Sequence, residues 1–283
     1  MGSTRPPWKI TLPSRPAGLP GVTMAGFSDR ANELTDIALV PHSAVTVLFD
    51  LGDEPFVVED GRGARQRERV VAGLAPDRAR GRGPARSAEC LQVRLSPIVA
   101  HAVLGGASAE LGGTVAALDD LWGREALLTQ ERLREARSWQ ERFAIAESAL
   151  VRRADPRRAV DPEVAFSWRR MVAGRGRVRV GRLVAETGWS RKRLWSRFRG
   201  QIGLTPKRVA QLIRFDHAAH RLAAGQRAAS VAAESGYADQ SHLNRDVMAF
   251  AGMTPTAVAR SPFLAIDDVA WPASAWPEKG WTG

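Results

Sequence analysis

The chain has 283 residues and a formal net charge of +11, with 41 Lys and Arg residues against 30 Asp and Glu residues. This length provides for roughly two domains, each with its own core. No segment approaches the roughly 20 apolar residues of a membrane span, and the N-terminal segment lacks a signal peptide's apolar core. The single cysteine excludes an intramolecular disulfide. We therefore expect a cytoplasmic protein with no membrane partner.

Short apolar stretches separated by Gly, Pro and Asp make up the first 95 residues. They are rich in Val, Leu and Phe, which is typical of β-strands. The predicted strands are 8–12, 22–27, 37–52, 55–60, 69–74 and 90–95. Their spacing favours an antiparallel roll or barrel. The segment 61–86 contains eight arginines and is predicted to be a polar hairpin loop around 69–74, with phosphate contacts or the rim of an acidic-ligand pocket as alternatives.

After residue 95 the apolar residues recur at helical spacing. We predict helices near 96–105, 115–136, 139–152 and 162–173. Apolar residues in the two central helices follow a heptad-like pattern: Leu121, Leu128, Leu133, Ala136, Phe143, Ile145 and Leu150. This pattern predicts either helices that pair in a homodimer or helices that cover the β-roll.

Segment 180–206 is predicted to form a helix, a tight turn and a second helix. Gly188 is suited to the left-handed conformation that ends a helix, and Ser190 to the N-cap of the next. Leu194 and Phe198 lie four residues apart on one face of that second helix. Its other faces carry Lys192, Trp195, Ser196 and Arg199.

The same pattern occurs again 48 to 49 residues further along the chain. Segment 183–189 (LVAETGW) aligns with 231–237 (VAAESGY), and 203–206 (GLTP) aligns with 252–255 (GMTP). Unrelated basic helices do not keep a turn, an apolar face and a terminal Gly-x-Thr-Pro in register. We infer two copies of one unit.

All of the net positive charge lies on this repeated unit. Residues 174–260 contain 16 Lys and Arg residues and 5 Asp and Glu residues, so the remainder of the chain is balanced. Charge kept for solubility would be spread more evenly. The concentration of charge is typical of a protein that binds a polyanion.

Residues 175–260 resemble the C-terminal DNA-binding domain of AraC-type (arabinose-operon regulator) transcription factors, in which a long helix joins two helix-turn-helix units. The resemblance lies in LVAETGWSRKRLWSRF, IGLTPKRVAQLIRFDHAAHRLAAG, SVAAESGYADQSHLNRDV and AGMTP. It implies that double-stranded promoter DNA is contacted by Arg191, Lys192, Trp195, Ser196 and Arg199 of the first unit and by Gln240, Ser241, His242, Asn244 and Arg245 of the second. It also implies contact with RNA polymerase.

These residue types are suited to reading DNA. Gln makes paired hydrogen bonds to adenine, Arg or Lys reads guanine, and Ser or Asn serves bases or phosphates. Ser196 and Val247 depart from the family, which often has Arg and Phe there, and Trp195 replaces a smaller polar residue. We expect Trp195 either to read thymine methyls or groove shape, or to pack against the connecting helix.

The strand-rich part followed by LSPIVAHAVLGGASAELGGTVAALDDLWG resembles the cupin-like sensor domain of actinobacterial AraC-type regulators. The resemblance implies a small-molecule effector. With the predicted strands and helices it gives an α+β chain: an antiparallel β-roll with helices at 1–154 and an all-α double helix-turn-helix domain at 155–265. The remaining segment, 266–283, is too rich in Pro and Gly to fold alone, so we expect a flexible tail, with docking of its Trp residues on the rest of the chain as the alternative. A cupin metal site needs clustered His and Glu, but the strands offer only His42, and His101 lies in a predicted helix. We therefore expect no metal or cofactor.

Three classes of catalytic motif are missing from the sequence: a phosphate-binding glycine loop, a paired metal-ligand motif and a Gly-x-Ser-x-Gly elbow. Cys90 lies in an apolar, strand-like context and is expected to be a buried apolar residue rather than a nucleophile. The resemblance to AraC-type regulators implies a sequence-specific transcription regulator, and these residues favour no enzyme. An enzyme with a DNA-targeting module and a nonspecific architectural DNA binder are the alternatives.

Overall fold

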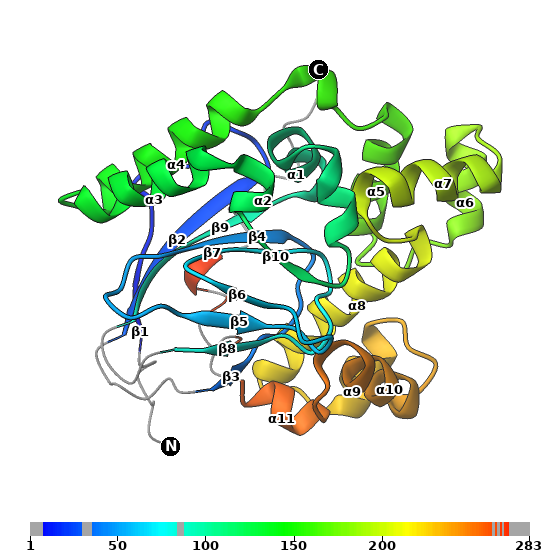
Figure 1. Ribbon diagram of the computed structural model, residues 1–283. Helices are drawn as coiled ribbons and strands as arrows, with labels where there is room; N and C mark the ends of the chain where they lie inside the picture. Colours follow the sequence, from blue (N-terminus) through cyan, green and yellow to red (C-terminus); the bar gives the residue numbers. More distant parts are fainter. Residues whose placement is uncertain are drawn as a thin grey trace.

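The computed structural model describes residues 8–29, 36–83, 88–261, 264, 267 and 269–271. A β-rich N-terminal part is followed by helices that lead into an all-helical C-terminal part (Figure 1). No helix in these described ranges is long and apolar enough to cross a bilayer.

The N-terminal part consists of two antiparallel sheets. The larger contains, in order across the sheet, β1 (Trp8–Thr11), β2 (Val22–Asp29), β9 (Glu89–Leu95), β4 (Val45–Asp50), β7 (Arg69–Ala72) and β10 (Val115–Ala117). The smaller contains β3 (Ile37–Ala38), β8 (Arg80–Arg82), β5 (Val57–Glu59) and β6 (Arg65–Arg67), and lies below the larger in Figure 1. A buried cluster of Leu48, Val58, Val70 and Val115 joins the sheets. The predicted antiparallel roll is confirmed.

Strand β9 shows how alternation divides the two sides of the larger sheet. Leu91, Val93 and Leu95 are fully buried in the core that continues into the helices. Their neighbours Gln92 and Arg94 point to the opposite side and line a cavity between the sheets. Because side chains alternate between the two faces of a strand, one face of β9 packs in the hydrophobic core and the other faces the cavity.

Segment 61–86 is not only a polar loop around β7. It also contains β6 and β8, which pair with β5 on either side; residues 84–86 lie outside the described residues. The sequences RQR and RGR show no apolar alternation. Instead Glu59 of β5 forms ion pairs with Arg65 at 3.1 Å and with Arg82 at 3.4 Å. Backbone pairing and surface charge hold these strands in place.

The predicted helix at 115–136 is broken into three elements. Val115 is buried and pairs with β7, so β10 replaces the first turn. The helical part is α2 (Asp119–Trp122) and α3 (Arg124–Glu135). Between them stands Gly123 with φ +59°, a conformation that favours glycine.

The other helices of this region follow the prediction closely. They are α1 (Pro97–Leu104), the 3₁₀ turn η1 (Gly106–Leu111), α4 (Trp139–Arg153), the 3₁₀ turn η2 (Pro156–Arg158) and α5 (Pro162–Ala173). Helices α3 and α4 lie across the larger sheet (Figure 1), and the Trp139 ring contacts Gly26 of β2 so closely that a Cβ there would overlap it. Leu133, Phe143 and Leu150 are buried in this packing, whereas Leu128 is 39% exposed. Most of the heptad-like positions thus cover the sheet.

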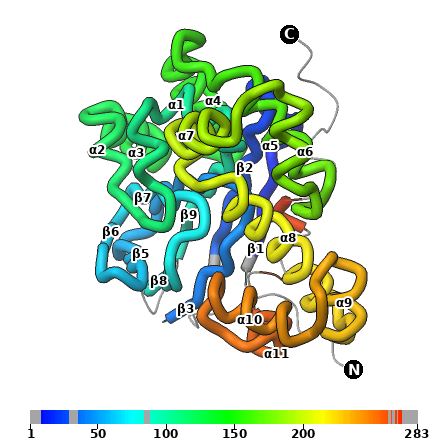
Figure 2. The backbone as a smooth tube through the Cα atoms, turned by 90° about the vertical axis from the view of Figure 1, so that its right-hand side faces the viewer, coloured from blue at the N-terminus to red at the C-terminus, as the bar shows by residue number. Residues whose placement is uncertain are grey.

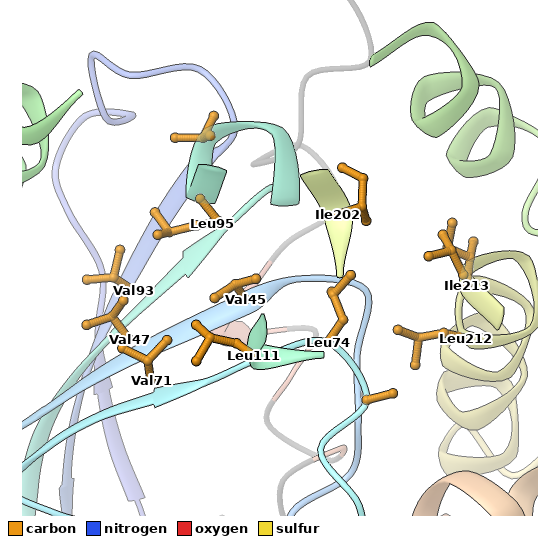
Figure 3. Close-up of a cluster of buried hydrophobic side chains, with 14 of the residues drawn as sticks. Val45, Val47, Val71, Leu74, Val93, Leu95, Leu111, Ile202, Leu212 and Ile213 are labelled. Carbon is orange, nitrogen blue, oxygen red and sulfur yellow. The ribbon is translucent and has the colours of Figure 1, made fainter. Parts of the chain in front are cut away.

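The C-terminal part contains α6 (Val180–Thr187), α7 (Arg191–Ile202), α8 (Pro206–Ala223), α9 (Ala228–Glu234), α10 (Gln240–Ala251) and α11 (Pro255–Ala259). Helix α8 runs between the two pairs of helices (Figure 2). One hydrophobic core extends from the larger sheet to this helix. Figure 3 shows Leu74 and Leu111 between the strands and Leu212 and Ile213 of α8.

Backbone contacts also join the two parts. Gly203, which ends α7 with φ +90°, lies so near η1 that a Cβ on it would be 2.7 Å from the carbonyl oxygen of Ala109. A Cβ on Gly112 would overlap the carbonyl oxygen of Gly203. Only glycine allows this approach, so the end of the first helix-turn-helix unit rests directly on the N-terminal part.

The expected flexible tail differs from the structure at its start. Asp267 and Trp271 are buried, and the Trp271 ring packs against Phe27 of β2 with ring centres 6.3 Å apart. Asp267 pairs with Arg94 of β9 at 2.6 Å. Charge pairing and an aromatic contact therefore dock this segment on the N-terminal part; residues 272–283 lie outside the described residues.

Candidate nucleic-acid interface

The first helix-turn-helix unit consists of α6 and α7. Gly188 adopts φ +68° after α6, and the Ser190 hydroxyl accepts a hydrogen bond from the backbone N–H of Arg193 at 3.2 Å. Both roles were predicted, and both are confirmed. The N-cap satisfies a backbone donor that the first turn of α7 leaves without a helical partner.

The second unit, α9 and α10, repeats this construction. Gly236 has φ +79° in the turn, and the Asp239 carboxylate accepts from the backbone N–H of His242 at 2.7 Å. Thr205 and Thr254 cap the helices that follow the two units, α8 and α11, in the same way. The two copies predicted from sequence are thus two copies in structure.

Each second helix buries one face. Leu194 and Phe198 of α7 are fully buried, and so are their counterparts Leu243 and Val247 of α10. Because these pairs hold one side of each helix in the core, the opposite side must face outward. That outward side carries the predicted DNA-contacting residues.

The structure places eight of these ten side chains in exposed positions and two in half-buried ones. The exposed ones are Arg191, Lys192, Ser196 and Arg199 on α7, and Gln240, Ser241, Asn244 and Arg245 on α10. The half-buried ones are Trp195 and His242. The His242 ring meets the Tyr237 ring edge-on with centres 5.2 Å apart. His242 therefore packs on the turn as well as bordering the outward side.

Trp195 is held by its own helix. The guanidinium carbon of Arg191 lies 5.0 Å from the centre of the Trp195 ring, within cation–π range. Trp189, in the preceding turn, is the tryptophan that packs against the hydrophobic core. The ring of Trp195 is thus half-buried beside Arg191.

Sequence reasoning passed over Met248. It lies one turn beyond Asn244 on α10 and is 45% exposed. The repeat alignment pairs it with Arg199 of α7, which was the available signal. An apolar side chain thus stands in the second unit where the first has a cation.

Three acidic residues of the module, Glu186, Glu234 and Asp246, are paired with arginines other than the predicted DNA-contacting ones. Hydrogen bonds from Arg170 and Arg182 lower the pKa of Glu186 to about 2. The bonds from Arg197 to Asp161, at 2.6 and 2.7 Å, likewise lower the pKa of that carboxyl. These carboxylates are therefore ionised and neutralised in place.

The outward cations are arranged differently. Among the described residues, Lys192, Arg199 and Arg245 form no ion pair with a carboxylate. Their charge remains available to a polyanion, which attracts cations over a distance of about 8 to 10 Å at physiological salt. Phosphate groups are such a partner.

A second feature is the cavity between the two sheets, with a volume of about 100 Å³. Its wall is mainly apolar and includes Phe27, Leu48, Phe56 and Val70, with a few polar groups such as His42. Burial lowers the pKa of His42 well below its usual value, so the ring is neutral. Neither His42 nor any other described residue belongs to a group of three or more potential metal ligands.

Cys90 also lines this cavity. Burial raises the pKa of its thiol to about 12. A thiol with this pKa stays protonated at neutral pH, and the thiolate is the reactive form. The environment of Cys90 agrees with the expectation of an apolar residue rather than a nucleophile.

A known sequence family matches the part of the chain that contains the repeated units. Residues 183–261 match the sequence family described as a helix-turn-helix domain, which is of AraC type. A search of curated protein sequences gives no match.

Solved structures extend the likeness to both parts of the chain. An apo ToxT variant from Vibrio cholerae is similar over 87% of this chain and 99% of its own, with 10% identity and a TM-score of 0.50. ToxT with an unsaturated fatty acid bound matches over 85% of this chain and 95% of its own, with 10% identity and a TM-score of 0.48. The AraC-like transcriptional activator CuxR matches over 84% of this chain and 91% of its own, with 14% identity and a TM-score of 0.30.

The apo ToxT variant therefore shares the fold, a β-rich part followed by two helix-turn-helix units. The match over 183–261 covers both units found in the structure, including the caps and glycine turns that repeat between them. The C-terminal part of the chain therefore contains a helix-turn-helix domain of AraC type.

Proposed function

We propose that this regulator reads a specific promoter sequence through the outward sides of α7 and α10. The observation that carries the proposal is the contrast in pairing on these helices. Arg197 and Arg214 are each paired with a carboxylate, whereas Lys192, Arg199 and Arg245 are exposed without an ionic partner among the described residues. An arrangement of this kind leaves positive charge for phosphates and hydrogen-bond donors for bases.

The two helices carry different chemistry. On α10, Gln240, Asn244 and Arg245 provide the side chains suited to hydrogen bonds with adenine and guanine. On α7 the outward side combines Lys192 and Arg199 with the ring of Trp195. We infer that α10 supplies most base recognition and that α7 contributes phosphate contacts and apolar contacts with the groove.

Met248 extends the reading side of α10. Its side chain is exposed one turn from Asn244. In the major groove the apolar group that DNA presents is the thymine methyl, and Met248 is suited to contact it. His242 and Ser241 complete the proposed interface near the start of the helix.

The cavity between the sheets is the proposed site for a small-molecule effector. It is enclosed by strands of both sheets and has an apolar wall with a few polar groups, which is the usual composition of a ligand site. Recovery of an unchanged small molecule from purified protein would support a sensor and argue against an enzyme with a DNA-targeting module.

Two further partners belong to the proposal. Leu127, Leu128 and Val151 remain exposed on α3 and α4, and these apolar side chains support contact with a second copy of the chain. Contact with RNA polymerase follows from the family resemblance. Light scattering of the full chain at micromolar concentration tests the homodimer, since a monomer there would contradict it.

Footprinting of the full-length protein on the DNA upstream of its own gene tests the central proposal. A sequence-specific regulator protects a short, defined site. An architectural binder would protect the whole fragment evenly, and that result would overturn the proposal.

A further inference from the structure

Arg94 stands where the cavity meets the C-terminal segment. It belongs to β9 and lines the cavity between the sheets. Its two terminal nitrogens donate to the carboxylate of Asp267 at 3.1 and 2.6 Å. Its Nε is buried and has no hydrogen-bond partner among the described residues. An unpartnered buried donor on a cavity wall favours a ligand that brings an acceptor.

Asp267 is shared between the cavity and the DNA-binding module. Its second contact is with Nε2 of His220 on α8, at 2.8 Å. On the other side of the ring, Nδ1 donates to the backbone carbonyl of Asp216 at 2.8 Å. The Asp216 carboxylate in turn accepts from the backbone N–H and hydroxyl of Ser43, both at 2.9 Å. One chain of polar contacts thus joins the cavity wall to the helix between the two helix-turn-helix units.

Trp271 adds an aromatic contact to the same place. The guanidinium carbon of Arg94 lies 4.3 Å from the centre of its ring. The ring also packs against Phe27, which lines the cavity. Asp267 and Trp271 therefore both contact the guanidinium group of Arg94.

We propose that Arg94 recognises the anionic group of an otherwise apolar effector, and that Asp267 occupies Arg94 as an internal competitor until the effector binds. This inference rests on the proposed role of the cavity as the effector site.

The charges around the cavity single out Arg94. Two carboxylates also line it, but both are already held: Glu89 pairs with Arg142 at 2.9 Å, and Asp50 accepts from the backbone N–H groups of Gly52 and Phe56. His42 is neutral and accepts from the backbone N–H of Ala44 at 3.2 Å. Arg94 is thus the cation on this wall that an acidic ligand meets.

The contact with Asp267 shows that both terminal nitrogens of Arg94 can donate to one carboxylate. Such a two-bond pair is the strong form of the arginine–carboxylate interaction. A ligand carboxylate would take over those bonds without leaving Asp267 unpaired, because His220 keeps its own bond to it. The exchange breaks the link between β9 and α8 while both charges stay neutralised. Occupancy of the cavity is thereby transmitted to the DNA-binding module.

The test measures binding of octanoate and of octanol to the full-length protein by calorimetry. These probes share an apolar chain and differ in the carboxylate. We expect octanoate to bind more tightly than octanol, and Arg94→Gln to abolish that difference. Arg142→Gln is the matched control, since Arg142 also pairs with a carboxylate and stacks on a tryptophan, Trp139, outside the cavity.

Two further variants test whether Asp267 competes with the ligand for Arg94, and they should change octanoate affinity in opposite directions. Asp267→Asn removes the competitor and should tighten octanoate binding about tenfold while leaving octanol within about twofold. His220→Gln removes the group that retains Asp267 after displacement and should weaken octanoate binding. Thermal melting confirms that each variant is folded, and either variant suffices if the other fails to fold.

The outcomes separate the inference from the proposed function. If both probes bind equally and no Arg94 or Asp267 variant changes their ratio, Arg94 is not the anion-recognising residue, although the cavity remains an effector site. If octanoate binds through Arg94 but Asp267→Asn and His220→Gln leave its affinity unchanged, competition by Asp267 is wrong. Failure of both probes to bind the wild type would overturn the inference together with the cavity's role, while DNA footprints would still test DNA recognition.

Discussion

Arg214 of α8 donates to the carboxylate of Asp246 on α10 at 3.1 Å, and this ion pair occupies the acidic group next to Arg245 in the sequence. Asp246 is buried, and the guanidinium of Arg214 also lies 4.6 Å from the centre of the Tyr237 ring. Glu234, the other nearby acid, pairs with Arg221. Arg245 is therefore exposed, with a hydrogen bond from its Nε to the Ser241 carbonyl of its own helix at 3.4 Å.

Arg245→Ala should weaken binding to the cognate site by about 1 to 3 kcal/mol and relax the preference at one base pair, because a paired contact to guanine is lost. The melting temperature should not change, since Arg245 holds no acidic residue of the fold. Binding to single-base variants of the site, measured beside thermal melting, tests this. A lowered melting temperature with unchanged relative affinities would show a structural role instead.

Arg199→Ala should weaken binding to all DNA sequences alike and lower the slope of log affinity against log salt by about one, because one phosphate contact and its counterion are removed. Arg197 is the matched control on the same helix, since it is paired with Asp161. Arg197→Ala should lower stability and leave the salt slope as it is. Equal salt slopes for wild type and Arg199→Ala would contradict the role of Arg199.

Gly112→Ala should disturb the contact between the N-terminal part and α7, because the added methyl would overlap the carbonyl oxygen of Gly203. Its φ of −59° is open to alanine, so the effect would come from this contact and not from backbone strain. Gly106→Ala is the control, since no atom lies within 4 Å of its added methyl. Overpacking typically costs about 1 to 3 kcal/mol. Urea unfolding of both variants measures this loss of unfolding free energy. Equal stabilities of Gly112→Ala and Gly106→Ala would mean that the contact between Gly112 and Gly203 does not hold the two parts together.

The pair of His220 and Asp267 predicts a loss of stability at alkaline pH. Burial lowers the pKa of His220, but the hydrogen bond to Asp267 and the charges of Asp216 and Asp267 outweigh it and raise the pKa to about 9. The folded pKa lies above the ordinary value of 6.5, so this stabilisation is complete below that value and disappears as pH rises through about 9. The pKa of Asp267 is lowered, so its carboxylate stays ionised throughout this range.

At about 1.4 kcal/mol per pKa unit, the contribution of His220 is at most about 3 kcal/mol. Wild-type protein should lose more unfolding free energy between about pH 6 and about pH 9.5 than His220→Gln does. Urea unfolding at the two pH values measures the difference. Identical losses in wild type and variant would mean that His220 is not protonated in the fold.

Local signals in the sequence predict the helix-turn-helix units closely. Gly188, Ser190 and the spacing of Leu194 and Phe198 determine a turn, a cap and a buried face without reference to distant residues. The repeat adds Gly236 by alignment. The outward side of each helix follows from the same spacing, which is why the predicted side chains lie there.

Features that depend on distant partners were not predicted. Strands β6 and β8 carry RQR and RGR, which show no apolar alternation and form by pairing with β5. Asp267 was placed in a flexible tail because its partners, Arg94 and His220, lie 173 and 47 residues away in the sequence. The alternation of β9 did hold a signal for Arg94, since a single arginine between buried Val93 and Leu95 must face the opposite side of the sheet.

Selection of preferred sites from random double-stranded DNA, with wild-type protein and with one variant of each outward side, tests DNA reading by both helices most directly. The wild type should select a site with two separate conserved segments. Gln240→Ala/Arg245→Ala should lose the preference in one segment, and Lys192→Ala/Ser196→Ala should change the other. Selection of no preferred sequence by the wild type, or the same loss in both segments with either variant, would contradict recognition by α7 and α10.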